Sequence, residues 1–354
     1  MKRLLLYLLL SLLVLALLAL GYWFFRQQKL TEFAQTRFGN EEAKLVLIQR
    51  GTGPLSLANQ LKEAGVIQDA SLFYEWIRRE GLSPKLKAGE YEFVGALTPA
   101  EVTQHIIDNK VKTYRFTVPE GLRMDETAPI LVAAGLGFSA QKLQELMHDA
   151  SFARKLGVPA KNLEGFLFPD TYLFVRGASE EDALKKMVKA TLDTYAAAPR
   201  KPGIALNLLE TITLASIIEK ETGAPEERPR ISCVFHNRLR KNWKLQTDPT
   251  VLYAKMLRQG YLHNNTITRS DLDTPHPYNT YTTYGLPPGP IASSGKAAIE
   301  AALMPLECDD FFFVSRNDGT HVFCADLACH NKAVEIWQEP LRKKRRQNNP
   351  PPSP

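Results

Sequence analysis

Cysteine is scarce in this sequence, and its spacing argues against a metal-binding role. The 354 residues hold four cysteines, with no C-x-x-C pair and no matched histidine spacing. A structural zinc site normally requires such spacing, so no metal is expected. An even number of cysteines permits disulfides in three possible pairings. Among them, Cys324 and Cys329 could close a small loop; the other two are Cys233 and Cys308.

The sequence also has only a small excess of charge of one sign. The formal net charge is only +6, and part of it lies at the two ends. Residues 341–354 hold a basic run followed by prolines, which predicts a disordered tail. Such a run can bind nucleic acid, but the first residues of the chain favour attraction to an anionic polymer or lipid. No nucleic-acid partner is expected.

Those first residues contain a long uncharged run, from Leu4 to Phe25. It is long enough to cross a bilayer, with Lys2 and Arg3 before it and aromatic residues at its end. A cleaved signal peptide would normally have a shorter apolar region and a small-residue cleavage site, so an uncleaved anchor is favoured. We expect residues 1–3 inside the cell, 4–25 in the membrane, and the rest outside the cytoplasm.

An internal repeat follows a predicted linker at 26–42. "LIQRGTGPLSLANQLKEAG" and "TVPEGLRMDETAPILVAAG" align at a constant offset of 70 residues, which pairs Gly51 with Gly121 and Gly65 with Gly135. Each copy predicts a short strand, a glycine turn and an amphipathic helix that ends at glycine. The first copy belongs to a small α+β module predicted at 43–112, in which Thr98 caps a helix. The second copy opens a larger mixed α+β domain predicted at 113–340.

One glutamate interrupts an apolar helix stripe in this larger domain. On a helix over 208–222, Leu208, Ile212, Ala215 and Glu219 share one stripe, whereas Glu221 lies on another face and is predicted to be solvated. A carboxyl in an apolar stripe either finds a partner or has a raised pKa, and a raised pKa suits a general acid. The structural alternative is an ion pair with an arginine, for instance Arg238 on the next helix.

Two later segments carry polar and aromatic side chains suited to sugars. "LQTDPTVLY" offers amide and hydroxyl groups before a helix that Asp248 could cap, and "YNTYTTYGLPPGPI" is an aromatic loop with tight turns. The loop could also be only a surface connection. "LEGFLFPDTY" adds two carboxylates, of which Glu164 could be a buried structural acid and Asp170 a turn residue. The candidate substrate-binding residues are Gln246, Thr247, Asn279, Tyr281, Tyr278 and Glu164.

Five segments in this order resemble the endolytic murein transglycosylase (YceG-like) family: "LEGFLFPDTY", "LASIIEKET", "VFHNRL", "LQTDPTVLY" and "YNTYTTYGLPPGPI". The resemblance spans essentially the whole extracytoplasmic part. It implies that residues 43–112 form a LysM-like subdomain and that Glu219, the first glutamate of "EKET", is catalytic. The four cysteines, His236 and the basic tail depart from the family pattern without touching that motif.

The resemblance implies an enzyme of the inner membrane that cuts nascent peptidoglycan strands from the extracytoplasmic side, close to peptidoglycan synthases. A lytic transglycosylase leaves 1,6-anhydro ends and requires one acid–base carboxyl, with no cofactor. Two alternatives stay open. A hydrolase would use Asp170 or Glu164 as a second carboxylate, and a scaffold that only binds the wall would leave Glu219 structural.

Overall fold

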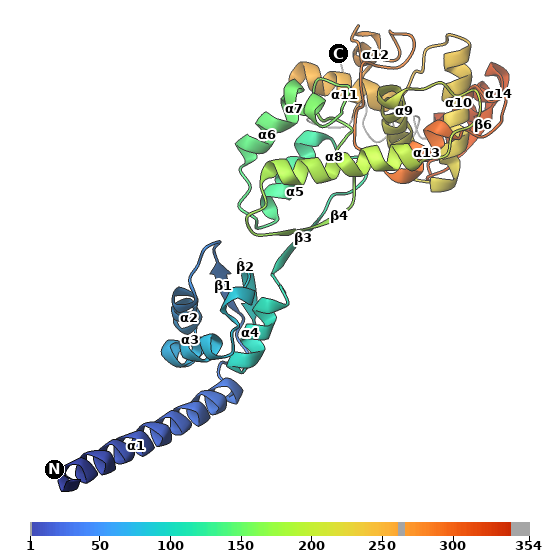
Figure 1. Ribbon diagram of the computed structural model, residues 1–354. Helices are drawn as coiled ribbons and strands as arrows, with labels where there is room; N and C mark the ends of the chain where they lie inside the picture. Colours follow the sequence, from blue (N-terminus) through green and yellow to red (C-terminus); the bar gives the residue numbers. More distant parts are fainter. Residues whose placement is uncertain (1, 261–265, 341–354) are drawn as a thin grey trace, which may run out of the picture. The chain divides into compact units, whose positions relative to one another are not determined.

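The computed structural model describes residues 2–260 and 266–340 (Figure 1). Helices dominate, and three two-stranded sheets lie among them, which confirms a mixed α+β protein. The chain divides into two compact units, Met1–Tyr114 with Leu173–Gly177, and Arg115–Tyr172 with Ala178–Pro354. The predicted tail at 341–354 lies outside the described residues.

Helix α1 (Lys2–Gln35) contains a candidate membrane span. Its segment Leu6–Gln35 is long and apolar enough to cross a bilayer, with a mean hydropathy of 2.5 in its most apolar window, none of which is buried. The last turns of α1 behave differently, because Leu30, Phe33 and Ala34 lie in the core of the first unit. The predicted linker at 26–42 therefore begins as a packed helix end.

The first unit builds its core between helices and one antiparallel pair of strands. Strands β1 and β2 pair with Val46 opposite Tyr91, and both side chains are buried. The predicted Thr98 cap is confirmed, since Thr98 and Glu101 form a capping box at α4. The elements after α1 are β1 (Lys44–Ile48), α2 (Pro54–Glu63), α3 (Ala70–Arg79), η1 (Ser83–Lys85), β2 (Gly89–Phe93) and α4 (Pro99–Ile107).

The predicted repeat is confirmed as local structure. Helix α2 begins at Pro54 and α5 at Met124, 70 residues apart, and each follows a strand and a glycine with positive φ (Gly51 at 85°, Gly121 at 76°). Only glycine adopts that backbone readily, which explains its use at both turns. The strand and helix of the second copy are β3 (Thr113–Thr117) and α5 (Met124–Ala133), and β3 pairs with β4 (Thr171–Val175).

The second unit places helix α9 (Leu208–Glu221) among other helices. Helices α10 (Arg228–Arg240), α11 (Asp248–Gln259) and α13 (Lys296–Leu303) all contact it (Figure 1). Strands β5 (Phe312–Ser315) and β6 (His321–Cys324) form an antiparallel pair that α14 (Leu327–Trp337) contacts. The remaining elements are α6 (Ala140–His148), α7 (Ala150–Lys155), α8 (Glu180–Ala197), η2 (Pro225–Glu227) and α12 (Arg269–Asp273).

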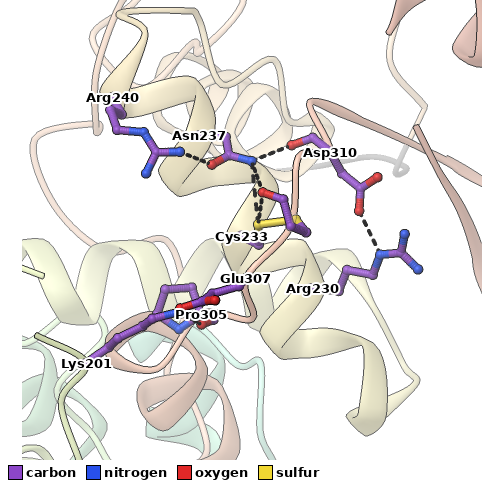
Figure 2. Close-up of a disulfide and its surroundings, with 9 residues drawn as sticks. Lys201, Arg230, Cys233, Asn237, Arg240, Pro305, Glu307 and Asp310 are labelled. Carbon is purple, nitrogen blue, oxygen red and sulfur yellow. Dashed lines mark hydrogen bonds and ion pairs between the residues drawn. A yellow bond between two sulfur atoms is a disulfide. The ribbon is translucent and has the colours of Figure 1, made fainter. Parts of the chain in front are cut away.

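Two disulfides select one of the three possible pairings, Cys233–Cys308 and Cys324–Cys329. The second closes the small loop that the sequence suggested. The first ties α10 to the segment that follows α13, and Figure 2 shows Asn237 reinforcing the same link. The Asn237 side-chain amide donates to the carbonyls of Cys308 at 3.0 Å and Asp310 at 2.8 Å. These bonds fix the helix whose first turn reaches the candidate site.

Candidate active site

Glu219 lies near the end of α9 with its carboxyl enclosed. The helix begins at a capping box formed by Asn207 and Glu210, and every residue from 211 to 218 is buried. The Glu219 side chain follows this buried run and is only 5% exposed. As the helical stripe predicted, the carboxyl points into the interior.

Two groups hold the Glu219 carboxyl. Arg228, the first residue of α10, forms an ion pair with Glu219, with 2.9 Å between Nη2 and Oε1. The backbone N–H of Gly295, directly before α13, donates to Oε2 at 3.0 Å. A guanidinium and a backbone N–H at a helix N-terminus are both complementary to the carboxyl oxygens that they contact.

A second carboxyl reaches the same place from the turn after β3. The Oε2 atom of Glu120 lies 3.6 Å from Nη2 of Arg228, the same atom that pairs with Glu219. Burial, followed by the charge of Glu219, raises the pKa of Glu120, although its side chain remains 51% exposed. A backbone link holds the turn in place, because Gly121 N–H donates to the carbonyl of Ser293 at 2.8 Å.

The structural alternative, a buried ion pair between Glu219 and an arginine, is confirmed, but the partner is Arg228. The named instance was wrong: the Arg238 guanidinium donates instead to the carbonyls of Leu245 and Phe311. Neither Arg228 nor Glu120 was identified from the sequence. Both reach Glu219 only through tertiary packing, and no spacing along the chain indicates that they lie close to it. Arg228 begins the same helix that carries Arg238.

The prediction that Glu221 is solvated was also wrong. Its carboxyl accepts a hydrogen bond from the buried hydroxyl of Thr247, and burial raises its pKa to about 7. The helical projection failed because α9 is enclosed by other helices, so its polar residues also meet protein.

Of the two predicted substrate-binding residues that precede α11, one is exposed and the other is buried. Gln246 is exposed, and its backbone N–H donates to the carbonyl of Thr280 at 3.1 Å. Thr247 precedes the first helical residue, so Asp248 is one position inside the helix instead of capping it. Asp248 accepts a hydrogen bond from the Tyr281 hydroxyl at 2.7 Å. Gln246 and Tyr281 both line a cavity of about 530 Å³.

The predicted aromatic loop holds itself together through Asn279. This buried side chain donates to three backbone carbonyls, those of Asp271, Leu272 and Thr274, and its own oxygen accepts from the N–H of Tyr281. Its polar groups are therefore used within the chain. The assignment of Asn279 and Thr247 to substrate stays a prediction that these contacts do not favour.

Glu164 is a buried acid whose carboxyl contacts the first residue of α5. It accepts from the N–H of Met124 at 3.1 Å and the hydroxyl of Tyr253 at 3.2 Å, and burial raises its pKa to about 7. The Tyr253 ring packs against Tyr278, with 4.9 Å between ring centroids. Glu164 and Tyr278 line a cavity of about 710 Å³.

A smaller cavity of about 290 Å³ is lined by Lys220, Tyr253 and Ile291 among others. Glu219 is not among its lining residues, although the neighbouring Lys220 is. The N–H of Ile291 donates to the Ser216 hydroxyl at 3.0 Å, which fixes the aromatic loop to α9.

In the described parts of the chain, no three His, Cys, Asp or Glu side chains gather in an arrangement that could hold a metal ion. Asp170 accepts the N–H of Thr171 at 2.6 Å, as a turn residue does.

Comparison with known proteins identifies the family. The YceG-like family matches residues 46–336. An endolytic murein transglycosylase of Bacillus subtilis is 33% identical over 309 residues, 82% of this chain and 83% of that protein. One of Streptococcus pneumoniae is 27% identical over 333 residues, 85% of this chain and 59% of that protein. The crystal structure of a yceG-like protein of Listeria monocytogenes has a TM-score of 0.54 at 32% identity, covering 83% of this chain and 99% of the other. This chain belongs to the YceG-like family.

Proposed function

We propose that the chain is a membrane-anchored endolytic lytic transglycosylase that limits the growth of nascent peptidoglycan strands. It is an enzyme of the lytic transglycosylase class, as the names of its relatives indicate. The bond it cuts joins N-acetylmuramic acid to N-acetylglucosamine. The observation that carries the proposal is the enclosed Glu219 carboxyl, held by a cation and by the backbone N–H that precedes a helix.

Glu219 performs both proton transfers in this proposal. Its protonated form gives a proton to the oxygen between the two sugars, and the muramyl 2-acetamido group supports the developing positive charge at C1. The resulting carboxylate takes the proton of the C6 hydroxyl of the same sugar as that oxygen attacks C1. A 1,6-anhydro ring closes, no water is consumed, and Glu219 recovers its proton.

Substrate contacts are proposed for the accessible candidates. Gln246 presents an exposed amide, and Tyr281 lines the same cavity, so together they can bind an acetamido group and a sugar face. Tyr278 lines the cavity above Glu164. Glu164 itself has two partners within the chain and acts by holding the start of α5.

Location and partners are proposed from α1 and the first unit. The span at 4–25 would leave residues 1–3 in the cytoplasm and hold the catalytic unit near the inner membrane, where synthases extend new strands. The module at 43–112 is proposed as a LysM-like subdomain that binds glycan.

A hydrolase would need a second carboxylate beside Glu219. The two candidates from the sequence are occupied elsewhere: Asp170 accepts the N–H of Thr171, and Glu164 accepts from Met124 and Tyr253. Digestion of purified peptidoglycan tests the proposal, with the new glycan ends analysed by mass. Anhydro ends, lighter than reducing ends by one water, are expected. Reducing ends would establish a hydrolase, and uncut glycan would establish a scaffold.

A further inference from the structure

Glu120, Glu219 and Arg228 form a cluster in which two carboxyls share one cation. Nη2 of Arg228 lies 2.9 Å from Glu219 and 3.6 Å from Glu120. Both carboxyls therefore face the same guanidinium nitrogen. The cluster is built from three distant segments of the second unit: the turn after β3, the end of α9 and the start of α10.

The cluster has zero net charge when its two carboxyls together hold one proton. Two ionised carboxylates beside a single guanidinium would leave a net negative charge at a largely enclosed site. Like charges in contact resist ionising together, and such a pair titrates as a unit. With one proton on the pair, the cluster is neutral whichever carboxyl holds that proton.

We propose that Glu120 is the positioning residue that keeps a proton available to Glu219, an inference that rests on the proposed function. Before cleavage, the proton passes from Glu120 to Glu219 beside the guanidinium that they share, and Arg228 stabilises the Glu120 carboxylate that results. Glu219 then gives the proton to the glycosidic oxygen as the bond to C1 breaks, and recovers one from the C6 hydroxyl. No proton is gained or lost over the cycle.

The surroundings support this role. Glu219 faces a cation and a backbone donor, Arg228 and the Gly295 N–H, and Glu120 is the acid that shares this cation. Burial and the Glu219 charge raise the pKa of Glu120, which favours a proton on the pair. Because half of the Glu120 side chain is exposed, water can supply that proton.

Other charged groups on the neighbouring segments have partners of their own. On α9, Lys220 donates to the carbonyl of Gly121 at 3.1 Å. Lys296 on α13 pairs with Glu300. Before α10, Glu227 binds His321, with 2.7 Å between Oε2 and Nδ1. At the start of α5, Arg123 pairs with Asp125 and Glu126. At the end of α9, Glu221 binds Thr247, with Arg238 and Asp248 nearby.

The first test is the pH dependence of anhydro-end formation by the full chain in detergent, with soluble glycan strands as substrate. Glu120→Gln keeps the shape of the side chain, but the cluster is then neutral without a proton. We expect the alkaline limb of the rate profile to move down by one pH unit or more, a loss of about tenfold at pH 7.5. At acidic pH the rate should stay close to that of the wild type. Glu120→Asp, which retains a carboxyl, should restore part of the alkaline activity.

Gly295→Ala provides a second route to the same effect. A Cβ at Gly295 would lie 1.7 Å from Oε1 of Glu120, so the half-exposed carboxyl must move away. The backbone N–H of residue 295, which donates to Glu219, is retained in this variant. The Gly295 φ of −73° suits alanine. This variant should shift the alkaline limb in the same direction as Glu120→Gln.

The outcomes separate the two proposals. A wild-type chain that makes no anhydro ends would overturn the proposed function and, with it, this inference. A wild-type chain that makes them, together with Glu120→Gln and Gly295→Ala variants whose alkaline limbs are unmoved, would overturn the inference alone. A loss of activity equal at every pH in both folded variants would also overturn it, since that result indicates a purely structural role.

Discussion

The ion pair between Glu219 and Arg228 joins the end of α9 to the first residue of α10, with 2.9 Å between the charged atoms and both side chains buried. The start of α10 is itself held, because Glu227 accepts both the backbone N–H and the ring of His321. The disulfide Cys233–Cys308 fixes the same helix further along (Figure 2). The cation beside the proposed acid is thus positioned by a rigid element, which favours a constant geometry at the carboxyl.

Replacement of Arg228 should destabilise the protein strongly. Arg228→Met keeps much of the side-chain volume but leaves two carboxyls without their cation, and we expect a loss of about 3–5 kcal/mol in the free energy of unfolding. Denaturant unfolding at pH 7 measures this loss. Arg269→Met, in an exposed pair with Asp273, is the matched control and should change little. Equal effects of the two substitutions would contradict the buried cluster.

Glu164 should make stability depend on pH. Its pKa rises from an ordinary 4.5 to about 7 on folding, so the native chain holds a proton that the unfolded chain releases between those values. Stability from this group is present at low pH and is lost as pH rises toward 7, by about 3 kcal/mol. Glu164→Gln should remove this loss, so the variant gains stability relative to the wild type as pH rises from 5 to 8. The exposed Glu145→Gln is the control, and parallel pH profiles for wild type and Glu164→Gln would refute the assignment.

Thr247 should act on stability through Glu221. Thr247→Val removes the hydroxyl that donates to the enclosed carboxyl, and an unsatisfied buried acceptor costs about 1–3 kcal/mol. Thr247→Ser retains the donor and should lose much less. Chemical denaturation of both variants makes the comparison. If Thr247→Val unfolds like the wild type but binds glycan more weakly, the residue contacts substrate as the sequence suggested.

Gly165, in the segment "LEGFLFPDTY", lies close against Pro290 of the aromatic loop. A Cβ there would lie 2.2 Å from the Cβ of Pro290, and the φ of 77° also disfavours alanine. Gly203 has a φ of 88° and nothing within 4 Å of such a Cβ, so it carries the backbone penalty alone. Thermal unfolding should show Gly165→Ala losing about 1–3 kcal/mol more than Gly203→Ala. A difference near zero would mean that the loops are not packed as described.

Sequence patterns predicted the local structure well where the signals are local. The offset of 70 residues located two strand–turn–helix copies, since glycine with positive φ and apolar spacing act within a few residues. The capping box at Thr98 was likewise readable. The prediction that α9 carries a carboxyl among apolar side chains rests on the same kind of local signal, the spacing of apolar residues along the helix.

The surroundings of the site could not be predicted in the same way. Periodicity shows which face of α9 is apolar, but not that neighbouring helices also enclose Glu221. The contacts of Glu120 and Gly295 with Glu219 join residues 99 and 76 positions away along the chain (219 − 120 and 295 − 219). Only packing brings them together, and one sequence carries no record of such pairs.

Replacement of the central carboxyl tests whether Glu219 is the catalytic acid. Glu219→Gln preserves shape but cannot donate a proton, and the measurement is the yield of anhydro ends from purified peptidoglycan, alongside binding of the same material. We expect a loss of at least about 100-fold in cutting with binding retained. Cutting by Glu219→Gln at the wild-type rate would show that another group supplies the proton.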